Sequence, residues 1–178
     1  YVLDPNNNNI MYLAAGKFLW RNDNLSGIPY ASNWDSISTN WVRFNDSSFT
    51  RLFDTTITAL AVSKVPANRV YIGTNYRRMF RIDSANVGTP AFREITSNTL
   101  FPAGATISCI AVDPNNADNV MAVFSNYGVA NRILYSTDGG TTWTKAGGNL
   151  EGLNGPSIRW ASIIPVSGGT VYLVATSV

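Results

Sequence analysis

Carboxylates are the first side chains in this sequence that could perform chemistry. A glycosidase needs two of them facing each other, about 5–5.5 Å apart for retention of configuration and about 6.5–9.5 Å apart for inversion. Among the acids outside the repeated pattern described below, the spacing pairs no two, and solvated surface acids are the simplest interpretation. Five candidate acids fall outside the repeated pattern described below: Asp35, Asp46, Asp54, Glu94 and Glu151.

Histidine is absent from all 178 residues, which excludes Ser-His-Asp and Cys-His catalysis and the commonest zinc ligands. The single cysteine, Cys109, lies in an apolar run typical of a strand and is expected to be a buried small side chain. Asp118 and the asparagines at 6–9 lack the spacing of a calcium loop, and turns explain them. The sequence therefore predicts no metal site, no cofactor and no catalytic residue.

Residues 136–143 contain the chain's most informative motif, Ser-x-Asp-x-Gly-x-Thr-Trp. Strand-forming residues flank an Asp-Gly-Gly turn, which predicts a β-hairpin. The motif resembles the Asp-box of BNR and sortilin-like β-propellers. In this interpretation Asp138 accepts hydrogen bonds that fix the turn, and Trp143 buries its indole between strands. The structural residues of the motif are Ser136, Asp138, Gly140, Thr142 and Trp143.

The motif belongs to a repeat. Asp4-Pro5 and Asp113-Pro114 each sit in a turn before an apolar strand, and Pro66 and Pro165 mark two degenerate copies. Their separations, 66 − 5 = 61, 114 − 66 = 48 and 165 − 114 = 51, suit a propeller blade. A second alignment equates Asp23 and Asp83 with Asp138, so each of these two residues is expected to mark a degenerate copy of the Asp-box.

The repeat predicts an all-β fold made of β-propeller blades, each with four antiparallel strands. Residues 57–62 and 107–112 are expected to be inner strands, because continuous apolar runs suit a sheet buried on both faces. The chain, 1–178, holds about three and a half blades, at 1–45, 56–96, 106–147 and 157–178. Since propellers need typically 4–8 blades to close, we expect a fragment of a larger propeller, completed by the rest of its parent chain or by another chain.

Two loop regions are candidates for ligand binding. An insertion between Asp23 and Trp41 carries Tyr30, Trp34 and Asp35, which either stack on and bond to a sugar or fold back over the blade. The turns between second and third strands are expected to surround one face of the propeller. They are either a binding site for carbohydrate or peptide, or ordinary polar loops. These turns carry Tyr76, Arg77, Arg78, Tyr127 and Asn131.

The Asp-box resemblance implies a secreted or cell-surface bacterial protein. Similar propellers occur in large secreted Bacteroidetes proteins that carry a type IX secretion sorting tail. We expect a non-catalytic interaction or scaffold domain that binds carbohydrate or protein. Two alternatives remain open: part of a xyloglucanase-type glycoside hydrolase whose acid pair is shared with other blades, and a sortilin-like peptide receptor. The net charge of +2 and scattered basic residues argue against nucleic acid, and no apolar run is long enough for a membrane span. No signal peptide or sorting tail is visible, and both ends are expected to be truncated.

Overall fold

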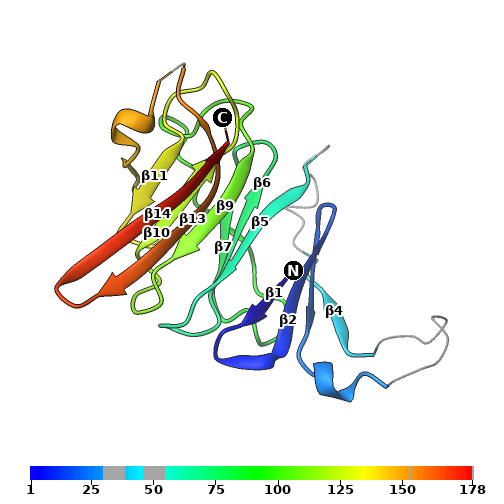
Figure 1. Cartoon of the computed structure of the whole chain (residues 1–178). Coiled ribbons are helices and arrows are strands. Elements are labelled where there is room, and N and C mark those ends of the chain that lie inside the picture. Colours follow the sequence, from blue (N-terminus) through cyan, green and yellow to red (C-terminus); the bar gives the residue numbers. More distant parts are fainter. Residues whose placement is uncertain (30–38, 46–54, 153, 178) are drawn as a thin grey trace.

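The computed structural model describes residues 1–29, 39–45, 55–152 and 154–177. Three four-stranded antiparallel sheets and one two-stranded sheet follow each other along the chain and are called blades 1 to 4 (Figure 1). Blade 1 contains β1 (Val2–Asp4), β2 (Asn7–Ala15), β3 (Phe18–Asn22) and β4 (Trp41–Arg43). Blade 2 contains β5 (Ile57–Val62), β6 (Val70–Thr74), β7 (Met79–Ile82) and β8 (Arg93–Glu94). Blade 3 contains β9 (Ile107–Val112), β10 (Val120–Phe124), β11 (Ile133–Ser136) and β12 (Thr144–Lys145). Blade 4 contains β13 (Ser157–Val166) and β14 (Gly169–Ser177).

The predicted all-β fold with four-stranded antiparallel units is confirmed. The expected inner strands coincide with β5 and β9. Their neighbours β6 and β10 are buried at every residue because each pairs on both sides and is covered on both faces. The described sheets are arranged like blades and do not close into a ring. The two 3₁₀ helices, Leu25–Gly27 and Gly148–Leu150, are too short to cross a membrane, and the described residues form no other helix.

The first strands of successive blades lie side by side, as β5, β9 and β13 do in Figure 1. Hydroxyl groups at equivalent positions join them. Thr58 Oγ1 donates to the Ile107 carbonyl at 2.7 Å, and Ser108 Oγ donates to the Ile158 carbonyl at 2.7 Å. This repeated bond fixes the distance between neighbouring blades at their inner strands.

Three hydrophobic clusters fill the spaces between the blades. The cluster between blades 1 and 2 includes Tyr12, Leu19 and Phe92, and the cluster between blades 2 and 3 includes Tyr71 and Trp143. The third cluster joins blade 3 to the two strands of blade 4. Blades 2 and 3 therefore each contribute one face to the core before them and the other face to the core after them, as units of a repeat protein do.

The strand pairing corrects the predicted alignment of Asp23 and Asp83 with Asp138. Ser136 pairs with Val120, whereas the residues at the equivalent ladder positions are Ile82 and Asn22. Asp23 and Asp83 therefore align with Thr137, one residue before Asp138. The error arose because the aromatic landmarks in the third strands occupy different ladder positions, which only the pairing of the strands reveals.

Candidate functional site

The turns between second and third strands lie at one end of the blades. This end is called the turn face, and it is formed by residues 16–17, 75–78 and 125–132. Each turn contacts the segment that begins the next blade: Ile57 N–H donates to the Gly16 carbonyl at 2.9 Å, and Arg77 N–H donates to the Ala105 carbonyl at 2.6 Å. Ser157 Oγ bonds to the Ser125 carbonyl in the same way. These bonds hold the turns next to one another on a rigid scaffold.

The turn of blade 2 opens onto a polar cavity of about 530 Å³. Its lining consists of Tyr76, Arg77, Arg78, Glu94, Thr96 and Asn98. Arg78 donates to both oxygens of Glu94, at 2.8 and 2.5 Å, and this bond lowers the pKa of the Glu94 carboxyl. The Arg78 guanidinium also lies over the Phe80 ring, 5.3 Å from its centre. The pair presents donors and an acceptor side by side with little net charge.

Tyr76 stands out from this cavity with 49% of its surface exposed. Its neighbour Arg77 has a left-handed backbone (φ 57°) and anchors the turn by donating from Nη1 to the Phe101 carbonyl at 3.0 Å. An exposed aromatic ring beside a fixed Arg–Glu pair and two further polar side chains is an arrangement that can hold a polar ligand with a flat apolar face.

The two predicted residues of blade 3 occupy the same face but make contacts of their own. Tyr127 is 57% exposed, and its hydroxyl shares a 2.9 Å hydrogen bond with Ser177 Oγ on β14. Asn131 has a left-handed backbone (φ 59°), and its Nδ2 donates to the Leu100 carbonyl at 3.0 Å, which ties the turn to the loop after β8. Tyr127 is therefore available to a ligand, whereas Asn131 has a structural bond. The remaining predicted residues, Tyr30, Trp34 and Asp35, lie outside the described residues.

Every described carboxylate accepts a hydrogen bond or ion pair from the chain itself. Both oxygens of Glu151 accept backbone N–H groups, from Arg132 at 2.9 Å and Ile133 at 3.1 Å. Asp4 and Asp113 accept the N–H two residues ahead, at 2.8 Å each, which confirms that they fix turns. The others are Asp23, Asp83, Glu94, Asp118 and Asp138. Asp46 and Asp54 lie outside the described residues.

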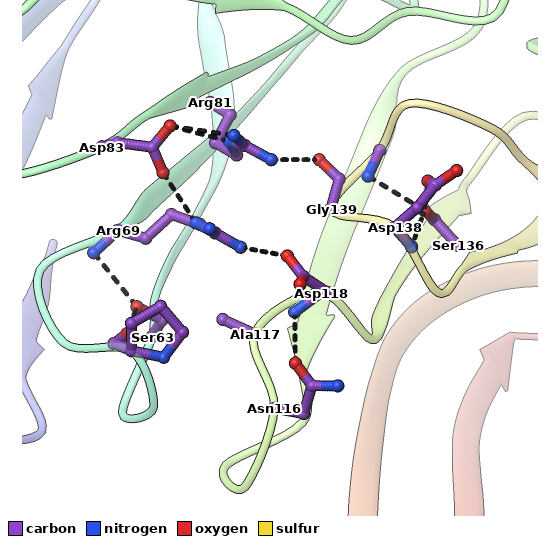
Figure 2. A network of polar contacts seen from close by, with 12 residues as sticks. Ser63, Arg69, Arg81, Asp83, Asn116, Ala117, Asp118, Ser136, Asp138 and Gly139 are labelled. Carbon is purple, nitrogen blue, oxygen red and sulfur yellow. Dashed lines mark hydrogen bonds and ion pairs between the residues drawn. The ribbon is translucent and has the colours of Figure 1, made fainter.

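The Ser-x-Asp-x-Gly-x-Thr-Trp motif forms the predicted hairpin clasp at the end of blade 3 opposite the turn face, and Figure 2 shows Ser136 and Asp138 of this clasp. Ser136 Oγ and Thr142 N–H donate to Asp138 Oδ1, each at 2.8 Å, and Thr142 Oγ1 donates to Oδ2 at 2.6 Å. Desolvation raises the pKa of this carboxyl, but these hydrogen bonds outweigh it and lower the pKa to about 2. Gly140 must be glycine, because φ is 88° and a Cβ would lie 2.5 Å from Ile95 Cδ1.

Replacing Asp138 by alanine is expected to reduce the free energy of unfolding by roughly 1 kcal/mol, because Ser136 and Thr142 lose their shared acceptor. The folded-state pKa of about 2 lies below that of an unfolded aspartate. The contribution of Asp138 is therefore complete above about pH 4 and is lost as pH falls towards about 2. Urea denaturation across this range should show a smaller acid loss in Asp138→Ala than in the wild type. Asp23→Ala removes a single 3.5 Å contact with Arg21 and should lose as much stability on acidification as the wild type does. If Asp138→Ala also lost as much stability as the wild type, the role of Asp138 in the clasp would be contradicted.

An ion-pair network that the sequence did not predict joins blades 2 and 3. In Figure 2, Arg69 lies between Asp83 and Asp118, at 2.7 and 2.6 Å, and Arg81 contacts Asp83 at 2.9 Å. Arg81 Nη1 also donates to the Gly139 carbonyl at 3.0 Å, next to the clasp. Desolvation raises the pKa of Asp83, but the two arginines more than compensate and lower it. Asp83 is therefore structural, as expected, but it binds arginines between blades.

A buried arginine is the second feature that the sequence did not reveal. The Arg132 side chain is fully buried and donates to the carbonyls of Leu150, Gly152 and Pro156 in the connection between blades 3 and 4. The only hint in the sequence is an arginine directly before an apolar strand, a position that does not distinguish a solvated arginine from a buried one. Arg132 thus serves the scaffold beneath the turn face.

Within the part of the chain that the structure describes, no group of three or more cysteine and acidic side chains is placed to hold a metal ion. Among the candidate residues, Arg77 and Asn131 make bonds that fix neighbouring loops, whereas Tyr76 and Tyr127 are exposed on the turn face. No protein-family model matches this chain, and a comparison with curated proteins finds no match either.

Proposed function

We propose that this chain is a non-catalytic β-propeller segment of a secreted, Asp-box-type protein and that its turn face binds a polar ligand. One observation carries the proposal: each described carboxylate accepts at least one donor of its own chain, and Asp4, whose Oδ2 has no donor, is fully buried, while Tyr76 is exposed beside a polar cavity. A glycosidase acid must remain protonated near neutral pH, which requires a raised pKa. The pKa values of Asp83, Glu94 and Asp138 are instead lowered.

Carbohydrate is the ligand class that this cavity suits best. The Tyr76 ring offers a flat surface for a sugar face, and the Arg78–Glu94 pair offers fixed donors and acceptors for hydroxyl groups. The same face could instead receive an extended peptide, whose carbonyl groups would take the arginine donors. The ring and the neutralised ion pair favour a neutral sugar over a strongly charged ligand.

Tyr76→Ala is expected to weaken binding at least tenfold, because the ring supplies most of the apolar contact in an otherwise polar site. A panel of polysaccharides and peptides should be assayed with the 178-residue chain for both binding and hydrolysis. The melting temperature should stay unchanged, because the exposed ring contributes little to folding. Val87→Ala replaces an exposed residue in the connection between β7 and β8, away from the turn face, and should bind normally.

Two outcomes would contradict the proposal. Binding that is unchanged in both Tyr76→Ala and Tyr127→Ala would place the ligand elsewhere. Hydrolysis of a polysaccharide that disappears in Glu94→Gln, with folding intact, would make this chain part of a glycoside hydrolase.

A further inference from the structure

Blade 4 exposes an unusually apolar sheet. Of the twelve large hydrophobic residues that are exposed in the described structure, six lie on β13 and β14: Trp160, Ile164, Val166, Val171, Tyr172 and Leu173. Among the described strands, β14 pairs with β13 alone, so one of its edges is free over nine residues. A long, apolar, unpaired edge is the kind of surface that accepts another strand.

An apolar cavity of about 250 Å³ lies beside this edge, between blade 3 and β14. Blade 3 and the connection after it supply Met121, Ile133, Tyr135, Ala146 and Leu150, and β14 supplies Tyr172 and Val174. The rings of Tyr135 and Tyr172 meet edge to face with their centres 5.4 Å apart. The cavity is therefore a gap in the core between blade 3 and β14, whose outer edge has no partner strand among the described residues.

The space between blades 2 and 3 shows what fills such a gap. The strand ladders make Tyr71 equivalent to Met121 and Met79 equivalent to Ile133. Ala122 pairs with Ile110 on β9, and Val174 pairs with Ala161 on β13. Because Ile110 and Ala161 occupy equivalent positions on the two first strands, Ala122 and Val174 are equivalent too. Between blades 2 and 3, these positions surround two buried side chains of blade 3, Leu134 on the third strand and Trp143 before the fourth.

The residues at equivalent positions in the other two cores indicate the size of the side chain that would fill the cavity beside β14. The residue after the fourth strand is Phe44 in blade 1, Ile95 in blade 2 and Ala146 in blade 3, and each donates its N–H to an equivalent third-strand carbonyl. Phe44 packs on Phe92, with ring centres 6.1 Å apart, and the smaller Ile95 packs with the larger Trp143. Ala146 is smaller still, so the cavity above it has room for an indole.

We propose that β14 and this cavity receive a β-hairpin from outside residues 1–178. Its first strand pairs antiparallel with β14 and places a large apolar side chain opposite Val174, as Phe80 lies opposite Ile72 and Leu134 opposite Ala122. An aromatic residue, tryptophan by size, follows nine to twelve positions later and fills the cavity above Ala146; the two internal examples are 143 − 134 = 9 and 92 − 80 = 12. A second copy of this chain fits less well, because an approaching β14 carries no tryptophan.

The chain's own Asp-box hairpin is a suitable probe. Ser125 and Ser177 each lie three residues after the equivalent pair Ala122 and Val174, so residues 1–177 can be followed directly by a second copy of residues 126–147 with the natural spacing kept. The melting temperature of this extended chain is expected to rise by roughly 5 °C or more. Hydrogen exchange should show new protection of the β14 amides that do not face β13.

Two matched variants test whether the cavity selects the indole. Trp143→Ala, made only in the appended copy, should lose most of the gain in melting temperature. Ala146→Phe in the first copy introduces the side chain that blade 1 has at the equivalent position 44. This variant should also lose most of the gain in melting temperature, because the new ring fills the cavity. Leu173→Ser should keep the gain in melting temperature, because Leu173 lies on the other face of β14 from Val174 and outside the cavity lining.

The possible results decide the proposal in each direction. An extended chain with unprotected β14 amides and an unchanged melting temperature would overturn it, and so would an equal gain in the Trp143→Ala variant. If the original 178-residue chain forms a dimer with protected β14 amides in both the wild type and Ala146→Phe, a second copy covers the edge and the proposal is wrong. Protection that requires both the appended indole and Ala146 supports it.

Discussion

Trp143→Ala is expected to lower the free energy of unfolding by about 3–5 kcal/mol, the largest loss for any substitution in the hairpin clasp of residues 136–143. The indole is only 8% exposed, and it fills the core between blades 2 and 3. Its Nε1–H donates to the Ile95 carbonyl at 2.9 Å, and its ring meets Phe101 edge to face at 5.1 Å. The loss combines a cavity, an unpaired carbonyl and a broken aromatic contact, and urea denaturation of the full chain measures it.

Trp143→Phe separates these contributions. The smaller ring keeps the contact with Phe101 but cannot donate to Ile95, so we expect a loss between those of the wild type and Trp143→Ala. Trp160→Ala is the matched control, because that indole is 51% exposed, and its effect should stay within about 0.5 kcal/mol. Equal losses at positions 143 and 160 would show that Trp143 does not join the blades. Ligand affinity should be unchanged in every variant that still folds.

Arg132→Ala is expected to cost about 3 kcal/mol or more, because it empties a fully buried site and leaves carbonyl groups without donors. The guanidinium donates to the Pro156 carbonyl at 3.0 Å and the Leu150 carbonyl at 3.4 Å, as well as to Gly152. These bonds shape the connection that leads from blade 3 into blade 4. Denaturant titration should therefore show a lower midpoint.

Two further substitutions identify the cause of that loss. Arg132→Met keeps most of the apolar stem and removes only the donors, so a loss close to that of alanine would attribute the effect to the hydrogen bonds. Arg132→Lys keeps the charge but lacks the planar fork that reaches several carbonyls at once, and it should recover only part of the stability. Arg159→Ala, at an exposed position, is the control. Wild-type stability in Arg132→Met would contradict a role for these bonds.

Much of the fold was predictable because strands and turns depend on local residue types. Apolar runs gave the inner strands β5 and β9 at their observed bounds, and the Asp-Gly-Gly turn predicted the clasp around Asp138. The alignment of Asp23 and Asp83 failed by one residue, because the register of a strand is set by its partner across the sheet. Sequence spacing does not contain that information when a repeat has diverged.

The candidate site was predictable only in part. Residues 75–78 were recognised as a turn that carries Tyr76 and two arginines, but the sequence could not indicate that Arg78 is paired with Glu94, sixteen residues away. It also gave Arg77 and Asn131 as ligand-binding candidates, whereas both use side-chain donors to fix neighbouring loops. Whether a polar side chain serves a ligand or the scaffold depends on which acceptors the fold brings near it.

By itself, the sequence determined that this protein is built from repeated antiparallel β-units and that Asp138 belongs to a hairpin clasp. These properties follow from alternating strand residues and from a turn that only a few residue types can make. Only the tertiary structure decided which charges are paired, which arginines are buried and where the core between blades 3 and 4 is open. Those features depend on contacts between blades about fifty residues apart, such as Thr58 with Ile107 and Trp143 with Ile95, which local residue types do not specify.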